Sequence, residues 1–151
     1  RDYTAFVSMS AALDFRQSTL GGEDAVYEYC RNLALAAKHY LMGLWKVEAM
    51  VPDEMEEFMI NIELPAGIDS IDAGKALMEN LETQHGIYML ALYDGPSGRL
   101  YTRLSAQVYL ELEDFQRLGM LVLDFVEEYS HRATLQNGND AEATTSYLLR
   151  E

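Results

Sequence analysis

One segment carries the clearest strand-to-helix pattern in the chain: Arg103-Leu104-Ser105-Ala106-Gln107-Val108-Tyr109, followed by Leu110-Glu111-Leu112-Glu113-Asp114-Phe115. Apolar residues at 104, 106 and 108 alternate with polar ones, the period of two that is typical of a strand with one buried face. The carboxylates at 111, 113 and 114 then favour the start of a helix, because negative charge suits the positive end of a helix dipole. We therefore expect a strand whose polar face carries Arg103 at its start and Tyr109 at its end.

Arg103 is the candidate binding residue of this strand. A guanidinium held on a strand offers a planar fork of donors that matches the two oxygens of a carboxylate. The alternative is an ordinary surface arginine on the face of a sheet. The residues of the strand by themselves favour the ordinary surface arginine.

The pattern along the rest of the chain predicts an α+β fold. Working back from residue 103, we expect a strand over 99–109, a turn at 94–98 and a strand over 87–93. Further upstream lie a helix over 69–86 that ends at Gly86, a strand over 58–64 and a long helix over 23–45. With a last helix over 111–130, this order indicates a small antiparallel or mixed sheet of about three strands, with helices mainly on one face.

Charge and composition exclude several classes of protein. The 151 residues include 25 acidic and 11 basic side chains, a formal net charge of −14. Such a surface repels nucleic-acid phosphates and anionic membranes, so we expect neither as a partner. No apolar run reaches the length of a transmembrane helix. The single cysteine, Cys30, lies on the apolar stripe of the long helix, where a core role is favoured over a nucleophile, and it fits a reducing, cytoplasmic compartment.

The quoted segment also resembles a known family. Arg-x-Ser-x-x-x-Tyr at 103–109, followed by an acidic turn and a helix, is similar to the C-terminal domain of class V aminotransferases, which are fold-type I pyridoxal-phosphate (PLP) enzymes. The branch it most resembles includes the isopenicillin N epimerase-like and cysteine-desulfurase-like proteins. Residues 1–6 and 11–15 resemble the segment that follows the large domain in the epimerase-like branch, so the resemblance covers nearly all of the chain.

The resemblance implies that two domains of one polypeptide have different roles. PLP would be bound by a large domain upstream, and this chain alone would bind no cofactor and be inactive. Its lysines, Lys38, Lys46 and Lys75, lie in helical segments without the family's motif, and we expect them in solvent. Arg103 would receive the α-carboxylate of a small amino-acid substrate, orienting the substrate relative to the cofactor. The expected partners are the large domain and a second copy in a homodimer.

The resemblance also implies domain boundaries. Residues 1–22 would connect to the missing large domain, 23–135 would form the small α+β domain, and 136–151 would be a polar, mobile tail. Phe6, Val7, Met9 and Leu13 form an apolar helix face suited to packing on that absent domain. The chain begins with Arg1 rather than methionine, which agrees with a piece of a longer polypeptide.

Two departures from the family limit what carries over. Leu110 stands where many relatives have asparagine after the tyrosine. Residues 85–102 contain no cysteine, which argues against desulfurase chemistry and leaves epimerisation, transamination and β-elimination open. A hypothesis from a different class is an independent small α+β module that binds a partner or dimerises without catalysis.

Overall fold

The computed structural model describes the backbone of residues 3–148 and the side chains of residues 3–132. Its elements, in chain order, are helices α1 (Thr4–Ser18) and α2 (Glu23–Trp45), the short 3-10 helix η1 (Asp53–Met55), strand β1 (Met59–Glu63), helix α3 (Ile71–His85), strands β2 (Leu92–Asp94) and β3 (Arg99–Ser105), and helix α4 (Leu112–Leu148). The predicted order of elements is confirmed.

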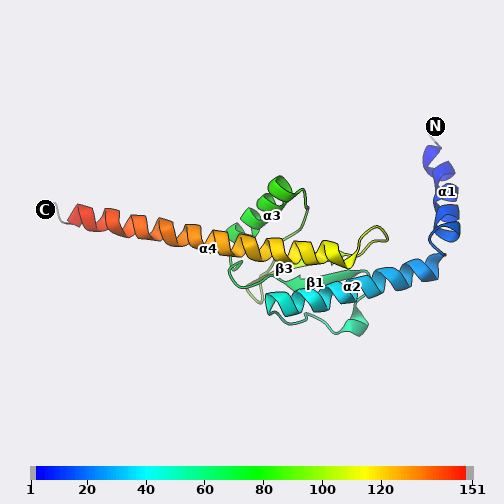
Figure 1. The fold of residues 1–151 in the computed structure, drawn as a ribbon, viewed down its shortest axis with the longest axis horizontal. Coiled ribbons are helices and arrows are strands. Elements are labelled where there is room, and N and C mark those ends of the chain that lie inside the picture. The colour runs from blue at the N-terminus through cyan, green and yellow to red at the C-terminus, as the bar shows by residue number, and fades with distance from the viewer. Residues whose placement is uncertain (1–2, 149–151) are drawn as a thin grey trace.

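The three strands form one antiparallel sheet with β3 in the centre, in the order β1-β3-β2. Alternate residues of β1 and β3, among them Ile60, Ile62, Leu100 and Leu104, are buried against the helices. The intervening residues of β3, including Arg103, are exposed or half-buried and so lie on the other face of the sheet. The helices α2 and α4 run along the sheet in Figure 1. The α+β class and the packing of helices on one face are therefore confirmed.

Helices α2 and α4 pack closely because a glycine lies where they meet. A Cβ atom added at Gly119 would lie 2.7 Å from Cδ2 atoms of both Leu41 and Leu44. The indole Nε1–H of Trp45 donates a hydrogen bond to the Gly119 carbonyl at 3.1 Å. Cys30 is buried on the same face of α2, with 4% of its surface exposed, as predicted.

The ends of α3 follow the sequence signals. The Ser70 hydroxyl accepts a hydrogen bond from the Ala73 N–H at 3.1 Å, which satisfies one of the free donors at the start of the helix. At the other end, Gly86 takes the left-handed conformation with φ +65°, which glycine adopts at little cost.

Two predicted strands are shorter than the alternation indicated. β3 ends at Ser105, and a turn in which the Leu110 N–H bonds to the Gln107 carbonyl replaces the expected strand up to Tyr109. Tyr109 is thus 78% exposed on a loop, and the expectation that it ends the strand's polar face was wrong. The strand expected over 87–93 is reduced to Leu92–Asp94, because the upstream residues leave the sheet.

The two ends of the chain form helices that extend beyond the sheet layer (Figure 1). α1 has no buried residue, so its apolar side chains face solvent. The backbone of α4 is helical as far as Leu148, well past the expected end at Ser130 and through most of the expected tail over 136–151. Residues 149–151 of that tail lie outside the described residues.

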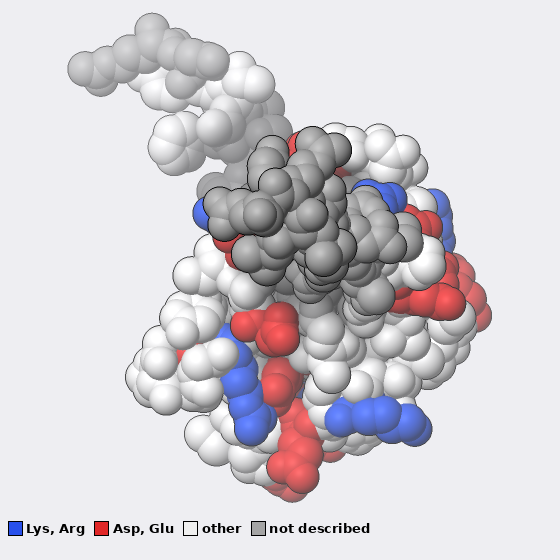
Figure 2. Space-filling model, turned by 90° about the vertical axis from the view of Figure 1, so that its left-hand side faces the viewer, with Lys and Arg blue, Asp and Glu red and all other residues white. Residues whose placement is uncertain are grey.

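The surface reflects the excess of acidic residues. On the side seen in Figure 2, acidic side chains form a band across the face, with basic side chains on either side of it. Within the described residues, no helix combines the length and the hydropathy needed to cross a bilayer.

Candidate functional site: a pocket at the open edge of the central strand

The candidate site is a pocket of about 440 Å³ beside the end of β3. Its walls come from the segment before β2, the end of β3 and the first turns of α4. The lining residues are Ile87, Tyr88, Met89, Leu90, Arg103, Leu104, Ser105, Leu110, Asp114, Phe115, Arg117 and Leu118. We call this the arginine pocket, because Arg103 and Arg117 carry its positive charge.

The pocket exists because the hairpin between β2 and β3 is incomplete. The hydrogen bonds from Leu64 N–H to Leu100 and from Ala106 N–H to Phe58 show that even-numbered residues of β3 bond to β1. In an antiparallel ladder the odd-numbered residues then direct their N–H and C=O groups to the opposite edge. β2 pairs only as far as Tyr101, so the backbone groups of Arg103 and Ser105 border the pocket without a strand partner.

The segment before β2 has its own anchors, which hold it away from that edge. The Ala91 N–H contacts the Met78 sulfur at 3.2 Å, and the Ile87 N–H bonds to the Leu81 carbonyl at 3.0 Å. Met89 is buried in the core, with 4% exposed. Side-chain packing thus overrides the alternation that predicted a longer strand.

Arg103 lies where the sequence placed it, on the polar face of β3 and directly across from Asn61 of β1. Its side chain is exposed and makes no hydrogen bond or ion pair with any described residue. Most other arginines in the described part contact a carboxylate, as Arg99 does with Glu63 at 2.8 Å. The Arg103 guanidinium is therefore free to bind an external anion.

Arg117 was not singled out by the sequence. It is also exposed, lines the same pocket and has no ion pair in the part of the chain that the structure describes. Asp114 lies one turn before it, but its carboxylate accepts the Glu111 N–H at 2.9 Å and so caps α4. No feature of the sequence distinguishes Arg117 from a solvated residue on a helix face, since its neighbours come from remote elements.

A second group of charges is buried elsewhere, and it corrects one expectation. Lys38 was expected in solvent, yet its side chain is 1% exposed. Its Nζ lies 2.9 Å from Asp53 Oδ1, 2.7 Å from Glu56 Oε2 and 2.8 Å from the Val51 carbonyl. We call Lys38, Asp53 and Glu56 the lysine cluster. The sequence held a sign of this burial. Lys38 lies four residues after Ala34 and so on the same buried face of α2, and an acidic segment follows that helix.

The charges of the lysine cluster shift each other's proton affinity. Burial by itself would lower the pKa of Lys38, but the contacts with Glu56 and Asp53 outweigh it and raise the pKa above its usual value. The hydrogen bond from Lys38 lowers the pKa of Asp53, and His39, whose Nε2 lies 2.8 Å from Asp53 Oδ2, adds to that effect. The cluster fixes the connection between α2 and β1 to the body of the domain.

The surroundings of the three lysines do not favour a PLP group, although Lys46 borders a hollow of about 280 Å³. Lys38 is enclosed by carboxylates, and its raised pKa disfavours the neutral amine that attacks a carbonyl. Lys75 is 69% exposed on the surface of α3, 3.8 Å from Asp72. Lys46 is exposed at the end of α2. These residues do not fit the cofactor. In the described part of the chain there is also no group of three or more His, Cys, Asp or Glu residues that could hold a metal ion.

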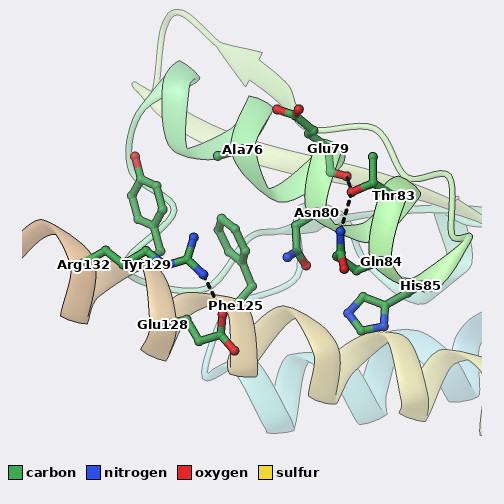
Figure 3. A pocket seen from close by; sticks show the side chains of 10 residues that line it. All are labelled: Ala76, Glu79, Asn80, Thr83, Gln84, His85, Phe125, Glu128, Tyr129 and Arg132. Atoms are coloured by element: carbon green, nitrogen blue, oxygen red, sulfur yellow. Dashed lines mark hydrogen bonds and ion pairs between the residues drawn. The ribbon is translucent and has the colours of Figure 1, made fainter.

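A larger hollow, of about 690 Å³, lies between α3 and α4 (Figure 3). Several of its polar side chains contact one another. Arg132 pairs with Glu128 at 3.2 Å, and Gln84 contacts the Thr83 hydroxyl at 3.3 Å. The rings of Phe125 and Tyr129 stack with centroids 5.3 Å apart. Because its arginine is already neutralised, this hollow is a weaker candidate for binding an anion than the arginine pocket.

Sequence comparison finds relatives among the curated proteins, although no family model matches the chain. The chain is 30% identical over 129 residues to the hercynylcysteine sulfoxide lyase of Schizosaccharomyces pombe, a match that covers 83% of this chain and 30% of that protein. It is 25% identical over 152 residues to an L-cysteine desulfhydrase of Arabidopsis thaliana, covering 91% and 33%. An L-cysteine desulfhydrase-like protein of Epichloe uncinata is 27% identical over 163 residues, covering 87% and 35%. The chain thus spans about a third of the length of these relatives.

The fold has a counterpart among solved structures. The crystal structure of Oryza sativa TDC with PLP and tryptamine matches with a TM-score of 0.51 at 20% sequence identity, over 68% of this chain and 22% of that one. At this identity the match shows the fold alone. The curated relatives are PLP-dependent, and they are lyases rather than transferases or isomerases. Over the region it shares with them, the chain is a distant homologue of the class V aminotransferase-like PLP enzymes.

Proposed function

We propose that the chain is the C-terminal domain of a PLP-dependent lyase and that Arg103 binds the α-carboxylate of its amino-acid substrate. The observation that carries the proposal is the free Arg103 guanidinium at the edge of the arginine pocket. A rigid strand holds the start of its side chain, so little ordering is needed when a carboxylate binds. The fork can then grip both carboxylate oxygens and fix the orientation of the ligand.

Among the reactions left open by the sequence, β-elimination is the one that the relatives support. Their names, sulfoxide lyase and cysteine desulfhydrase, refer to sulfur-containing amino acids. We therefore favour the cleavage of such an amino acid over epimerisation or transamination. Since the lysines of this chain do not fit PLP, the cofactor would be held by an upstream large domain of the same polypeptide, and the enzyme would act as a homodimer.

The test is an Arg103→Lys variant in the polypeptide encoded together with its upstream region. The charge stays but the fork is lost, so we expect amino-acid affinity to fall about tenfold while PLP remains bound. Titration with substrate, followed by the cofactor's absorbance, measures both quantities. Arg132→Lys is the matched control, because that arginine is exposed and pairs with Glu128 in the other hollow. Equal affinities in the two variants would remove Arg103 from the site.

A second candidate function, a dimerisation module without catalysis, is favoured by α1. Its large apolar side chains are more than half exposed, with Phe6 at 72% and Val7 at 73%. Exposed apolar surface of this kind is usually covered by a partner. The upstream coding sequence separates the two functions, because a PLP-lysine motif within it supports the enzyme and a start codon next to Arg1 supports the module.

Self-association through α1 gives a further prediction. The net charge of −14 opposes the meeting of two copies, and salt screens that repulsion. We expect the 151-residue chain to dimerise more strongly as ionic strength rises, and a chain that lacks residues 1–15 to stay monomeric. Sedimentation of both proteins at low and high salt measures this. An intact chain that is monomeric at every salt concentration would rule out α1 as a self-association surface.

A further inference from the structure

Asn61 of β1 lies directly across the sheet from Arg103. The backbone hydrogen bonds between the two strands join even-numbered residues, as at Leu64 and Leu100. Asn61 and Arg103 therefore form a pair without backbone hydrogen bonds, which is the closer of the two kinds of pair in an antiparallel ladder. In such a pair the Cβ atoms lie about 5 Å apart and both side chains project from the same face of the sheet.

The side-chain amide of Asn61 is not engaged in the fold. It is exposed and makes no hydrogen bond with any other residue between 3 and 132. Glu63, the next residue of β1 on this face, shows the opposite arrangement, because its carboxylate pairs with Arg99 at 2.8 Å. A neutral amide at position 61 leaves the charge of Arg103 uncompensated, and its NH2 group adds two donors beside the guanidinium.

We infer that Asn61 is a second carboxylate-binding residue, whose amide donates a hydrogen bond to the substrate carboxylate that Arg103 binds. The inference rests on the proposed function, in which Arg103 takes the α-carboxylate. The register supplies the geometry, since two neighbouring side chains on one face can donate to the two oxygens of a single carboxylate. An ionised carboxylate only accepts hydrogen bonds, so it suits both residues, and a ligand without this group leaves both donors unused.

The test compares two sulfur compounds that differ only in the carboxylate: L-methionine and the amine that remains when its carboxylate is removed. Methionine is a sulfur-containing amino acid without a leaving group on Cβ, so it binds without β-elimination. Each compound is titrated by calorimetry into the polypeptide encoded together with its upstream region. We call the ratio of the two affinities the carboxylate preference, and expect methionine to bind about a hundredfold more tightly than the amine.

Two substitutions of Asn61 change the site in different ways. Asn61→Ala removes the donor and should lower the carboxylate preference about tenfold, with the affinity for the amine unchanged. Asn61→Asp keeps the shape of the side chain but places a carboxylate beside Arg103 that competes with the ligand, so its loss should be larger. Asn32→Asp, the matched control, makes the same change of charge at an exposed position of α2 and should leave the preference unchanged.

Arg103→Gln separates the role of Asn61 from the proposed function, because it should lower the carboxylate preference by at least about tenfold. An unchanged preference in Asn61→Ala would overturn the role of Asn61, and so would a loss in Asn61→Asp that Asn32→Asp equals. A preference that survives Arg103→Gln, or none in the unmodified polypeptide, would instead overturn the proposed function.

Discussion

The lysine cluster and the arginine pocket use charge in opposite ways. Lys38 is enclosed by two carboxylates and a carbonyl and is almost fully buried. Arg103 and Arg117 lie at the surface in a chain rich in acidic residues, yet neither contacts a carboxylate among residues 3–132. A buried charge must be compensated within the protein because desolvation is costly. An exposed charge is solvated by water and stays available to bind a ligand. The lysine cluster is thus expected to matter for folding, and the arginine pocket for binding.

The largest expected effect comes from breaking the lysine cluster. Lys38→Met leaves Glu56, which is 3% exposed, as a buried carboxylate without its cation. We expect the free energy of unfolding to fall by about 3–5 kcal/mol, measured by chemical denaturation. Lys75→Met, which removes an exposed lysine, is the control and should change it by less than about 0.5 kcal/mol. Equal effects of the two variants would contradict a structural role for Lys38.

A double variant sharpens that comparison. Lys38→Met combined with Glu56→Leu removes both buried charges and replaces them with apolar groups of similar size. Because the desolvation cost disappears with the charges, the double variant should recover most of the stability lost in Lys38→Met. The same denaturation measurement tests it. A double variant as unstable as the single one would mean that the loss comes from packing rather than from an orphaned charge.

A smaller effect is expected from pH. The lowered pKa of Asp53 stabilises the fold above the unfolded pKa of about 4, and this stability is lost as the pH falls through the folded pKa. The raised pKa of Lys38 stabilises the fold below its unfolded value of about 10.5, and this contribution is lost as the pH rises through the folded pKa. Denaturation at intervals from pH 2 to 11 should show these losses in the unmodified chain. The double variant Lys38→Met with Glu56→Leu, which leaves no buried carboxylate without a cation, should flatten both, and an unchanged profile would count against the assignment.

The smallest effect on folding is expected in the arginine pocket. Arg103→Gln and Arg117→Gln remove exposed charges that have no ion-pair partner in the described part of the chain, so each should change the free energy of unfolding by less than about 0.5 kcal/mol. Thermal or chemical denaturation measures this. A loss of about 2 kcal/mol or more in the free energy of unfolding of either variant would show that the arginine stabilises the fold. The arginine would then not differ from Lys38 in the way described above.

The comparison also shows what the sequence could predict. Local patterns were enough for the element order, because the stripe of α2, the Ser70 cap and the Gly86 stop each act within a few residues. The same holds for the alternation that put Arg103 on the polar face of β3. The resemblance to PLP enzymes, carried by residues 103–109 and the first fifteen residues, agrees with the relatives found by sequence comparison.

What the sequence missed depends on contacts between remote segments. Lys38 meets Glu56 through the path of the connection after α2, which no periodicity specifies. The strand expected over 87–93 is cut short because Met89 packs in the core, and the arginine pocket opens as a result. Arg117 enters that pocket only through the packing of α4 beside β3. Binding sites of this kind arise from tertiary structure, so residue patterns alone did not reveal the second arginine.

The most direct test of the central claim is the binding of L-alanine, an amino acid with one carboxylate and an inert side chain, to the 151-residue chain. NMR titration of the arginine Nε–Hε signals reports on each guanidinium separately. We predict that the Arg103 signal shifts in a saturable way, that the paired Arg99 and Arg132 signals stay in place, and that Arg103→Lys weakens the binding. Binding that leaves the Arg103 signal unmoved, or an affinity that is the same in Arg103→Lys, would contradict the assignment of Arg103 as the carboxylate-binding residue.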